Sequence, residues 1–418
     1  MIALMLAASA QAATLEDAWA AMERTSTEHR ALEAQTDARE TIVGQTLGTL
    51  GPKVSMSGAW TVNQFESSFD PSAMIPGAPP GDPIVIQAKE AFSGSATVVQ
   101  PLFSGSALPG YRAAQASAGA ARADEQTGQD DLKLAVAQVF WTVIASRERV
   151  AIATASQASA ERHLVLVKAR ADLGKVRPTE VSRAEIEVLK ATRDQLEARG
   201  ATSRAEAEFS RWTGLPATEP LEKTAPPEVP HADLAAAQAA AAASPRVVAA
   251  EARAQAAHRM SLATSMGFLP SINGRFTEAF SENTGFAGKK VQWQAAITAD
   301  WTLWDGGVRV AKMSEARTSA VAADAGAQRE REVAVTETTQ RWTDLAVARE
   351  ALDIAHRERE LTAATLKIAE ESYALGALTE VDLSDARIAL DGARLGEVRA
   401  EMSVELATLA LLRATGSL

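Results

Sequence analysis

Four segments of the chain alternate apolar and polar side chains, which is the pattern of a β-strand with two different faces. The clearest has apolar residues at Val291, Trp293, Ala295, Ile297, Ala299, Trp301 and Leu303. The period of two predicts strands at about 52–65, 91–103, 270–280 and 290–304. Each strand reaches the roughly 9 to 11 residues that cross a bilayer, whereas soluble sheets usually have strands of about five or six. We therefore expect membrane-spanning strands, and a half-buried sheet of a soluble domain is the alternative.

Long helical patterns occupy most of the remaining sequence. The stripe of Leu132, Val136, Val139, Val143 and Val150 follows a 4-3-4-7 spacing. This heptad spacing predicts a helix at about 106–173 that packs against neighbouring helices, and a soluble coiled coil is its alternative interpretation. Gly174 and Pro178 end this helix, and a second one at about 179–213 returns antiparallel to it. A first helix is predicted at about 15–47. At ~1.5 Å per residue, the length of the long helix matches the summed lengths of this first helix and the returning helix stacked end to end.

The same order of elements, namely helix, two strands, helix, break and helix, occurs twice. Landmark residues recur 201 or 202 positions later, with Leu102, Phe103, Gly105 and Trp141 matching Leu303, Trp304, Gly306 and Trp342, and Leu173-Gly174 matching Leu375-Gly376. A period this long is typical of a duplicated module rather than of a solenoid. The predicted repeats are 13–214 and 232–416, with hairpin tips near 174–180 and 376–382 and a Pro-rich linker at 215–231.

The first residues predict an export signal. Ile2 to Ala8 form an apolar run, and Ala10-Gln11-Ala12 has the small-x-small pattern of a signal-peptidase site. We therefore expect a signal peptide at 1–12, although an ordinary helix start is the alternative because no Lys or Arg precedes the apolar run. Elsewhere the sequence has no uninterrupted apolar stretch of ~18 residues, so we expect no transmembrane helix.

Composition and charge exclude several classes of function. The 418 residues include no cysteine, which excludes disulfide scaffolds, thiol catalysis and thiolate metal sites. The net charge of −11 argues against nucleic acid as a partner. The five histidines lie far apart, so no helical metal-binding pair exists. We expect no catalytic residues, no metal site and no cofactor.

Strands arranged as two hairpins cannot close a membrane barrel within one chain. Because an open sheet edge in lipid leaves backbone groups unpaired, several copies must share one barrel. Two copies would supply eight strands and three would supply twelve, and both counts are allowed. The Pro-rich loop 66–90 and the shorter loop 281–290 are expected on the exterior.

The duplicated order resembles the outer-membrane efflux protein family typified by TolC. The residues that carry the resemblance are Leu50-Gly51-Pro52, Phe268-Leu269-Pro270, Leu303-Trp304-Asp305-Gly306-Gly307, Leu173-Gly174-Lys175-Val176 and Leu375-Gly376-Ala377-Leu378. The resemblance covers essentially the whole mature chain and implies a mainly α fold with a transmembrane β-barrel. It implies a homotrimer in the cell outer membrane, whose twelve-stranded barrel continues into a periplasmic α-helical barrel.

The function implied by the resemblance is that of a passive outer-membrane exit duct in a tripartite efflux or type I secretion system. Its partners would be a periplasmic adaptor (membrane fusion) protein and an inner-membrane pump. A soluble periplasmic coiled-coil scaffold is an alternative. A periplasmic adaptor is another, but the sequence shows neither the lipoyl-like domain nor the inner-membrane anchor of an adaptor. The cargo stays open among drugs, metals, metabolites and polypeptides.

The resemblance also implies roles for residues near the second break. Gly376, Asp382 and Asp385 match the family spacing of a glycine and two aspartates, and those aspartates line the pore constriction as rings. Helix capping is the alternative role, because carboxylates are favoured at helix N-termini.

Further roles follow for the gate and the hairpin tips. Glu180 stands at a family aspartate, and Tyr373 matches a tyrosine that bonds to it in the closed gate. Leu378 stands where TolC has an arginine, so the closed gate is expected to be weaker or to be held by different contacts. The residues expected to contact the adaptor are Gly174, Lys175, Val176, Gly376, Ala377 and Leu378.

Overall fold

The computed structural model describes residues 13–70, 83–174, 177–216, 220–223, 227–284 and 288–418, and they are mainly helical. The expected signal peptide at 1–12 lies outside the described residues. The chain forms two compact units. Unit 1 comprises Met1–Gln35, Arg122–Ala249 and Gln328–Leu418, and unit 2 comprises Thr36–Ala121 and Ala250–Ala327. Each unit takes segments from both halves of the sequence, so the units do not follow the predicted repeat boundaries.

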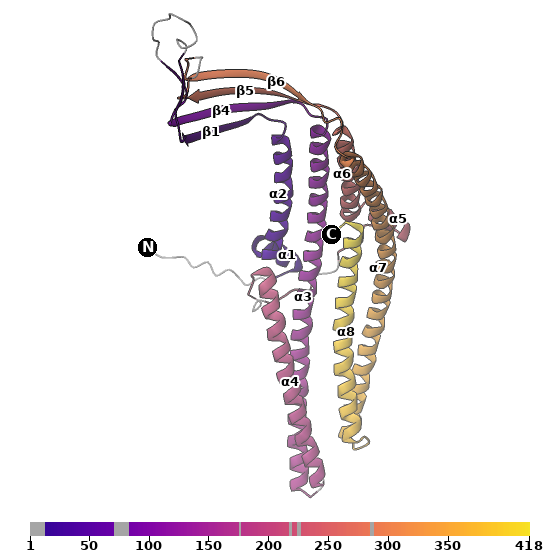
Figure 1. Cartoon of the computed structure of the whole chain (residues 1–418). Coiled ribbons are helices and arrows are strands. Elements are labelled where there is room, and N and C mark those ends of the chain that lie inside the picture. The colour runs from indigo at the N-terminus through magenta and orange to yellow at the C-terminus, as the bar shows by residue number, and fades with distance from the viewer. Residues whose placement is uncertain (1–12, 71–82, 175–176, 217–219, 224–226, 285–287) are drawn as a thin grey trace, which may run out of the picture. The chain divides into compact units, whose positions relative to one another are not determined.

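Unit 2 contains a four-stranded antiparallel sheet in the order β1-β4-β5-β6 (Figure 1). Its strands are β1 (Lys53–Val62), β4 (Glu90–Phe103), β5 (Ser271–Ser281) and β6 (Val291–Asp300). The hairpins from the two halves of the sequence meet where β4 pairs with β5. Strand β6 ends before the predicted 304, and Trp301 leaves the ladder so that its indole N–H donates to the Phe268 carbonyl at 3.0 Å.

Two further strands lie in the segment predicted as a loop. Strands β2 (Ser67–Phe69) and β3 (Ile84–Gln87) form a separate two-stranded sheet. The tip between them, 71–82, lies outside the described residues. Strands of three and four residues are too short for their periodicity to be recognised in a sequence.

The helices of the first half are α1 (Leu15–Thr25), α2 (Thr27–Gly48), α3 (Ala107–Asp172) and α4 (Pro178–Thr213). The helix expected at about 15–47 is broken at Ser26. Its hydroxyl accepts hydrogen bonds from the backbone N–H groups of Glu28 at 3.1 Å and His29 at 3.3 Å. Ser26 therefore caps the start of α2 within a region whose composition favours a continuous helix.

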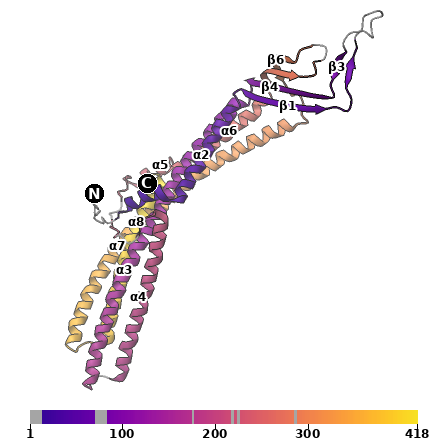
Figure 2. The same ribbon diagram turned by 90° about the vertical axis from the view of Figure 1, so that its left-hand side faces the viewer.

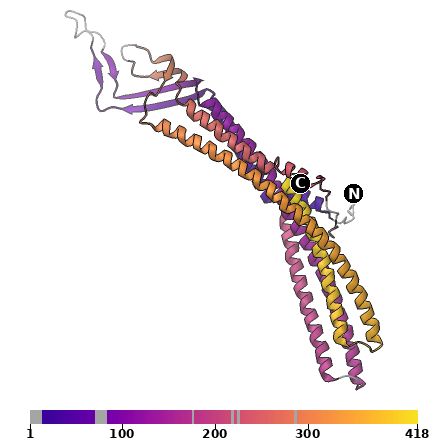
Figure 3. The ribbon, with the colours of Figure 1, turned by 90° about the vertical axis from the view of Figure 1, so that its right-hand side faces the viewer.

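The helices of the second half are α5 (Leu234–Ala241), α6 (Pro245–Met266), α7 (Val308–Ala374) and α8 (Glu380–Thr415). In unit 1, α3 and α4 form one helical hairpin and α7 and α8 form another, and Figures 2 and 3 show the four helices side by side from opposite sides. Among the described residues, no helix has a stretch long and apolar enough to cross a membrane.

The main core of unit 1 joins α1, α3, α4 and α8. Val136 and Val143 of the predicted heptad stripe are fully buried there. The rings of Phe140 on α3 and Phe209 on α4 pack with their centroids 6.2 Å apart. Leu409 brings α8 into the same cluster. Burial of these side chains holds the two helical hairpins together at this level of unit 1.

Candidate channel and gate residues

The sheet of unit 2 has one apolar and one polar face. Its register aligns Val54 with Val98, Val98 with Phe276 and Phe276 with Ala295, and side chains paired in this way lie on the same face. On the other face, hydroxyl groups of neighbouring strands contact one another, with Ser57 and Ser95 at 2.9 Å and Thr97 and Thr277 at 3.1 Å.

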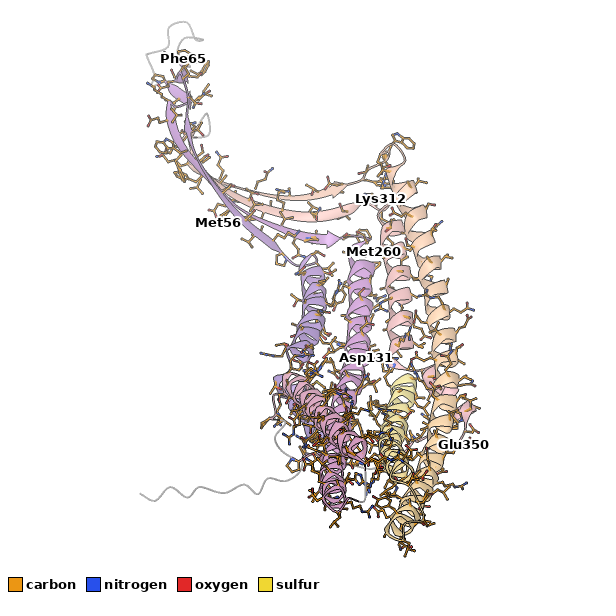
Figure 4. The ribbon with its side chains drawn as sticks, turned by 90° about the horizontal axis from the view of Figure 1, so that it is seen from below. Met56, Phe65, Asp131, Met260, Lys312 and Glu350 are labelled. Carbon is orange, nitrogen blue, oxygen red and sulfur yellow. The ribbon has the colours of Figure 1, made fainter. Side chains whose placement is uncertain are left out.

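No described residue of unit 2 covers the apolar face. Met56 on the edge strand β1 is 84% exposed (Figure 4), and Ile297 on β6 is 76% exposed. The aromatic rings of Phe276 and Trp293 stack on this face with their centroids 6.2 Å apart. Apolar side chains on a contiguous exposed face mark a surface that is covered by lipid or by another molecule.

The two helical hairpins end in tight turns. Gly174 follows α3 with a φ of +69° and Gly376 follows α7 with a φ of +73°, a left-handed conformation that favours glycine. At the second tip, the Gly376 N–H bonds to the Tyr373 carbonyl and the Ala377 N–H to the Ser372 carbonyl, which is a Schellman motif. Ala377 is exposed and Leu378 is half-buried, whereas Lys175 and Val176 lie outside the described residues.

Asp382 forms a capping box with Thr379 at the start of α8. Its carboxylate accepts hydrogen bonds from the Thr379 hydroxyl at 2.6 Å and the Thr379 backbone N–H at 3.0 Å. The bond from the hydroxyl first, and then that from the backbone, lowers the pKa of Asp382 below its ordinary value. Asp382 is therefore ionised at neutral pH, in an orientation set by its cap.

Asp385 and Glu180 line one groove between α8 and α4. The groove has a volume of about 810 Å³. Its apolar lining includes Ile186 and Ile388, which are both exposed, and the Ser384 hydroxyl donates across it to Glu187 at 3.0 Å. The structure thus brings two of the predicted site residues, Glu180 and Asp385, to the same surface.

Tyr373 lies in the last turn of α7 and contacts α3. Its hydroxyl accepts a hydrogen bond from the Arg170 guanidinium at 3.2 Å, and that guanidinium lies 5.5 Å from the centre of the tyrosine ring. The ring of His163 lies 6.4 Å from the same ring. Among the described residues, no hydrogen bond joins Tyr373 to Glu180. Sequence reasoning missed Arg170 and His163, because no motif marks either residue.

Unit 1 also contains buried carboxyl groups that no sequence pattern indicated. Burial raises the pKa of Asp130 to about 6, although the charges of Lys133 and Arg413 oppose this rise. Burial alone raises the pKa of Glu405 to about 7, and neither of its carboxyl oxygens has a hydrogen-bond partner among the described residues. Among all the residues that the structure describes, no group of three or more His, Asp or Glu side chains is placed to hold a metal ion.

Comparisons with known proteins agree with this geometry. The family model described as outer membrane efflux protein matches residues 25–215 and 236–417. No curated protein sequence matches the chain.

Solved structures with a similar fold include the CmeC outer membrane channel of Campylobacter jejuni, with 14% identity and a TM-score of 0.80 over 96% of this chain and 85% of that one. The outer membrane protein VceC of Vibrio cholerae has 15% identity and a TM-score of 0.78 over 96% of both chains. The open state of the MtrE outer membrane channel of Neisseria gonorrhoeae has 16% identity and a TM-score of 0.77 over 96% of this chain and 88% of that one.

Proposed function

The chain belongs to the outer membrane efflux protein family, and from this premise we propose that it is the exit duct of a tripartite efflux or type I secretion system. It is a non-enzymatic channel of the outer membrane. In the proposed system, substrates pass passively from the periplasm or the pump to the cell exterior. A periplasmic adaptor protein and an inner-membrane pump would complete the pathway.

The observation that carries the proposal is the two-faced sheet of unit 2. Uncovered apolar side chains suit contact with lipid, and the hydroxyl-rich opposite face suits a water-filled lumen. Among the described strands, the edge strands β1 and β6 each pair with only one neighbour. Since an unpaired edge is costly in lipid, we infer that β6 of one copy pairs with β1 of the next. Three copies would close a twelve-stranded barrel, and a soluble scaffold would have no use for the apolar face.

The proposed pore constriction is formed by Asp382 and Asp385 at the start of α8. Their carboxylates are exposed and lie within one turn of each other. In a trimer, each residue would occur three times around the axis and attract cations into a confined opening. Asp382 also caps α8 through Thr379, and this bond fixes the orientation that its carboxylate would have in the constriction.

The proposed gate lies near the tips of the hairpins, with Glu180 on α4 and Tyr373 on α7 among its residues. These two residues belong to different hairpins, so a relative movement of the hairpins would alter the contacts of both. The exposed turn residues Gly174, Gly376 and Ala377, together with Lys175, Val176 and Leu378, are the proposed contacts of the adaptor. In this arrangement the helical part lies in the periplasm.

Reconstitution of the protein, purified from outer membranes, tests the proposal. In detergent, native mass spectrometry is expected to give three copies of the 44.0 kDa chain, less any cleaved signal peptide. In planar bilayers, the same preparation should conduct ions. A stable monomer in aqueous buffer that gives no conductance would overturn the proposal.

The orientation is tested separately with cysteine variants, since the chain has no native cysteine. Ser68→Cys on β2 is expected to react with an impermeant maleimide on intact cells. Ser182→Cys on α4 should react only after the outer membrane is disrupted. Both side chains are exposed, so a difference in labelling reports the side of the membrane. Reversed labelling would contradict the proposed orientation.

A further inference from the structure

We propose that a groove beside Lys312 in unit 2, the Lys312 groove, binds the headgroup of an anionic phospholipid in the periplasmic leaflet of the outer membrane. The inference rests on the proposed function, because it takes the apolar face of the sheet to be the face that contacts lipid. It goes beyond that function by assigning a ligand to a surface outside the proposed pore constriction and gate.

The Lys312 groove lies where three helices of unit 2 adjoin the sheet. Its volume is about 340 Å³, and its walls come from the start of α3, the end of α6 and the start of α7, with a lining that includes Ser106, Gly110, Met260, Thr264, Arg309 and Lys312. Strand β4 ends at Phe103 and β6 ends at Asp300, so the groove is only a few residues from the ends of both strands. Figure 4 labels Met260 and Lys312 near the helix ends that adjoin the sheet.

The groove is linked to the apolar face of the sheet through Phe268. The indole N–H of Trp301, which continues the apolar alternation of β6 and is 62% exposed, donates to the Phe268 carbonyl at 3.0 Å. The Arg309 guanidinium lies 4.9 Å from the centre of the Phe268 ring. Exposed tryptophans beside a lipid-facing band lie at the level of the headgroups. The Lys312 groove is therefore placed at the depth where phosphate groups would lie.

The charges of the groove favour an anion. Its described lining contains two cationic side chains and no carboxylate. Arg309 is held by Asp305, whose carboxylate lies 2.9 Å from the guanidinium, so its charge is partly neutralised. Lys312 is exposed, and no described carboxylate forms an ion pair with it. Because an unpaired cation at a membrane surface attracts anionic headgroups, we assign the main phosphate contact to Lys312.

The remaining lining suits a lipid better than a free phosphate ion. Met260 on α6 is 51% exposed and provides an apolar wall beside the two cations. The Thr264 hydroxyl already donates to the Met260 carbonyl at 2.9 Å, so its proton is not available to a ligand. A free phosphate is bound tightly by several charged or N–H donors, whereas a phospholipid needs a cation for its phosphate and an apolar surface for the start of its acyl chains.

Native mass spectrometry of the oligomer in detergent tests the site by titration with phosphatidylglycerol or phosphatidylcholine of identical acyl chains. The unaltered protein should retain phosphatidylglycerol in preference to phosphatidylcholine. Lys312→Gln should lower the affinity for phosphatidylglycerol about fivefold, the effect of losing one cation near a membrane surface, and leave that for phosphatidylcholine unchanged. Lys367→Gln removes an exposed lysine from the far end of the same helix and is the matched control. Met260→Gln should lower the retention of both lipids.

Three results would overturn the headgroup site. The first is equal retention of the two lipids by the unaltered protein, and the second is an unchanged affinity of Lys312→Gln for phosphatidylglycerol. The third is displacement of phosphatidylglycerol by inorganic phosphate, which would show that the groove binds a free anion. The mass of each variant oligomer verifies that assembly is unchanged.

Failure of the proposed function is a distinct outcome, because lipid retention is measured in detergent without any conductance. An unaltered protein that conducts in planar bilayers but shows no preference for phosphatidylglycerol contradicts the headgroup site alone. An unaltered protein that does not conduct contradicts the proposed function instead.

Discussion

The Arg413 guanidinium lies 2.7 Å from the Asp131 carboxylate, and this contact joins the end of α8 to α3. A second nitrogen of the same guanidinium donates to Glu337 of α7 at 3.0 Å. The side chains of Arg413 and Glu337 are mostly buried, at 21% and 19% exposed. One cation therefore connects three helices of unit 1, and water competes weakly at its bond to Glu337, whereas Asp131 is 52% exposed.

Arg413→Ala should lower the free energy of unfolding by about 2 kcal/mol, because partly buried carboxylates lose their charged donor. Arg413→Lys should have a smaller effect, since an ammonium keeps the charge but not the forked geometry. Urea unfolding in detergent measures both changes. Equal stability of Arg413→Ala and the unaltered protein would show that the contact contributes nothing to folding.

Glu405 should make stability fall as pH rises from about 4.5 to about 7. Its pKa is raised from 4.5 to about 7 in the folded chain, so the folded state holds an extra proton between these pH values. The contribution of this proton to the free energy of unfolding is complete below pH 4.5 and is lost as pH rises through about 7. The total loss is roughly 3 kcal/mol.

In urea unfolding measured from pH 4 to 8, Glu405→Gln should remove the slope between about pH 6 and 7. Asp130, whose pKa is raised from 3.8 to about 6, should leave a slope of the same sign below about pH 6. Glu360→Gln alters an exposed carboxylate and should leave the profile unchanged. A flat profile in the unaltered protein would contradict the prediction.

Replacing Asp382 and Asp385 together by Ala should reduce cation selectivity and remove block by divalent cations in planar bilayers. The reason is the loss of six carboxylates from the proposed constriction of a trimer. The trimer should remain folded, because each helix-terminal charge contributes at most about 1 kcal/mol. Asp353→Ala on α7 removes another exposed carboxylate and serves as the control. Unchanged selectivity and block in the double variant would reduce the two acids to helix caps.

Cation selectivity should also persist to lower pH than an ordinary aspartate allows. The bonds from Thr379 lower the pKa of Asp382, so its carboxylate stays charged as pH falls through the ordinary value of 3.8. Thr379→Val removes the hydroxyl donor and should move the loss of selectivity to higher pH. Reversal potentials recorded at pH 3 to 6 measure the shift. An identical pH profile in Thr379→Val would show that this bond does not tune the constriction.

A charge on the apolar face of the sheet should prevent stable insertion. Ile297→Arg should destabilise the membrane-inserted protein by about 2 to 4 kcal/mol if the site lies near the bilayer midplane. Gln294→Arg places the same side chain on the opposite face of β6 and should be tolerated. Heat stability of the oligomer extracted from outer membranes compares the two. Equal stability would contradict a lipid-facing role, because Ile297 is exposed within the protomer and its replacement disturbs no internal packing.

Local patterns located much of the fold because strand and helix periodicity depend on near neighbours. The alternation around Val291 and the heptad stripe around Val136 are of this kind. The sequence did not predict the break between α1 and α2 at Ser26, because a serine hydroxyl caps a helix only when the backbone turns there. The sequence did not predict strands β2 and β3, because three or four residues do not establish a period.

The candidate site was only partly accessible from sequence. Spacing and resemblance indicated Asp382, Asp385, Glu180 and Tyr373 as single positions. Their neighbours depend on how one hairpin is registered against the other. The meeting of Glu180 with Asp385 in one groove, and of Tyr373 with Arg170, follows from that register.

The sequence by itself predicted two-faced strands, long helical hairpins and a duplicated order of elements, because these predictions depend on local spacing or on direct repetition of residues. Only the tertiary structure decided that Arg170 holds Tyr373 and that Glu405 is buried without a partner. Arg170 and Tyr373 are 203 positions apart in the chain. Their contact depends on how the two hairpins pack against each other, which the burial of side chains such as Phe140, Phe209 and Leu409 fixes.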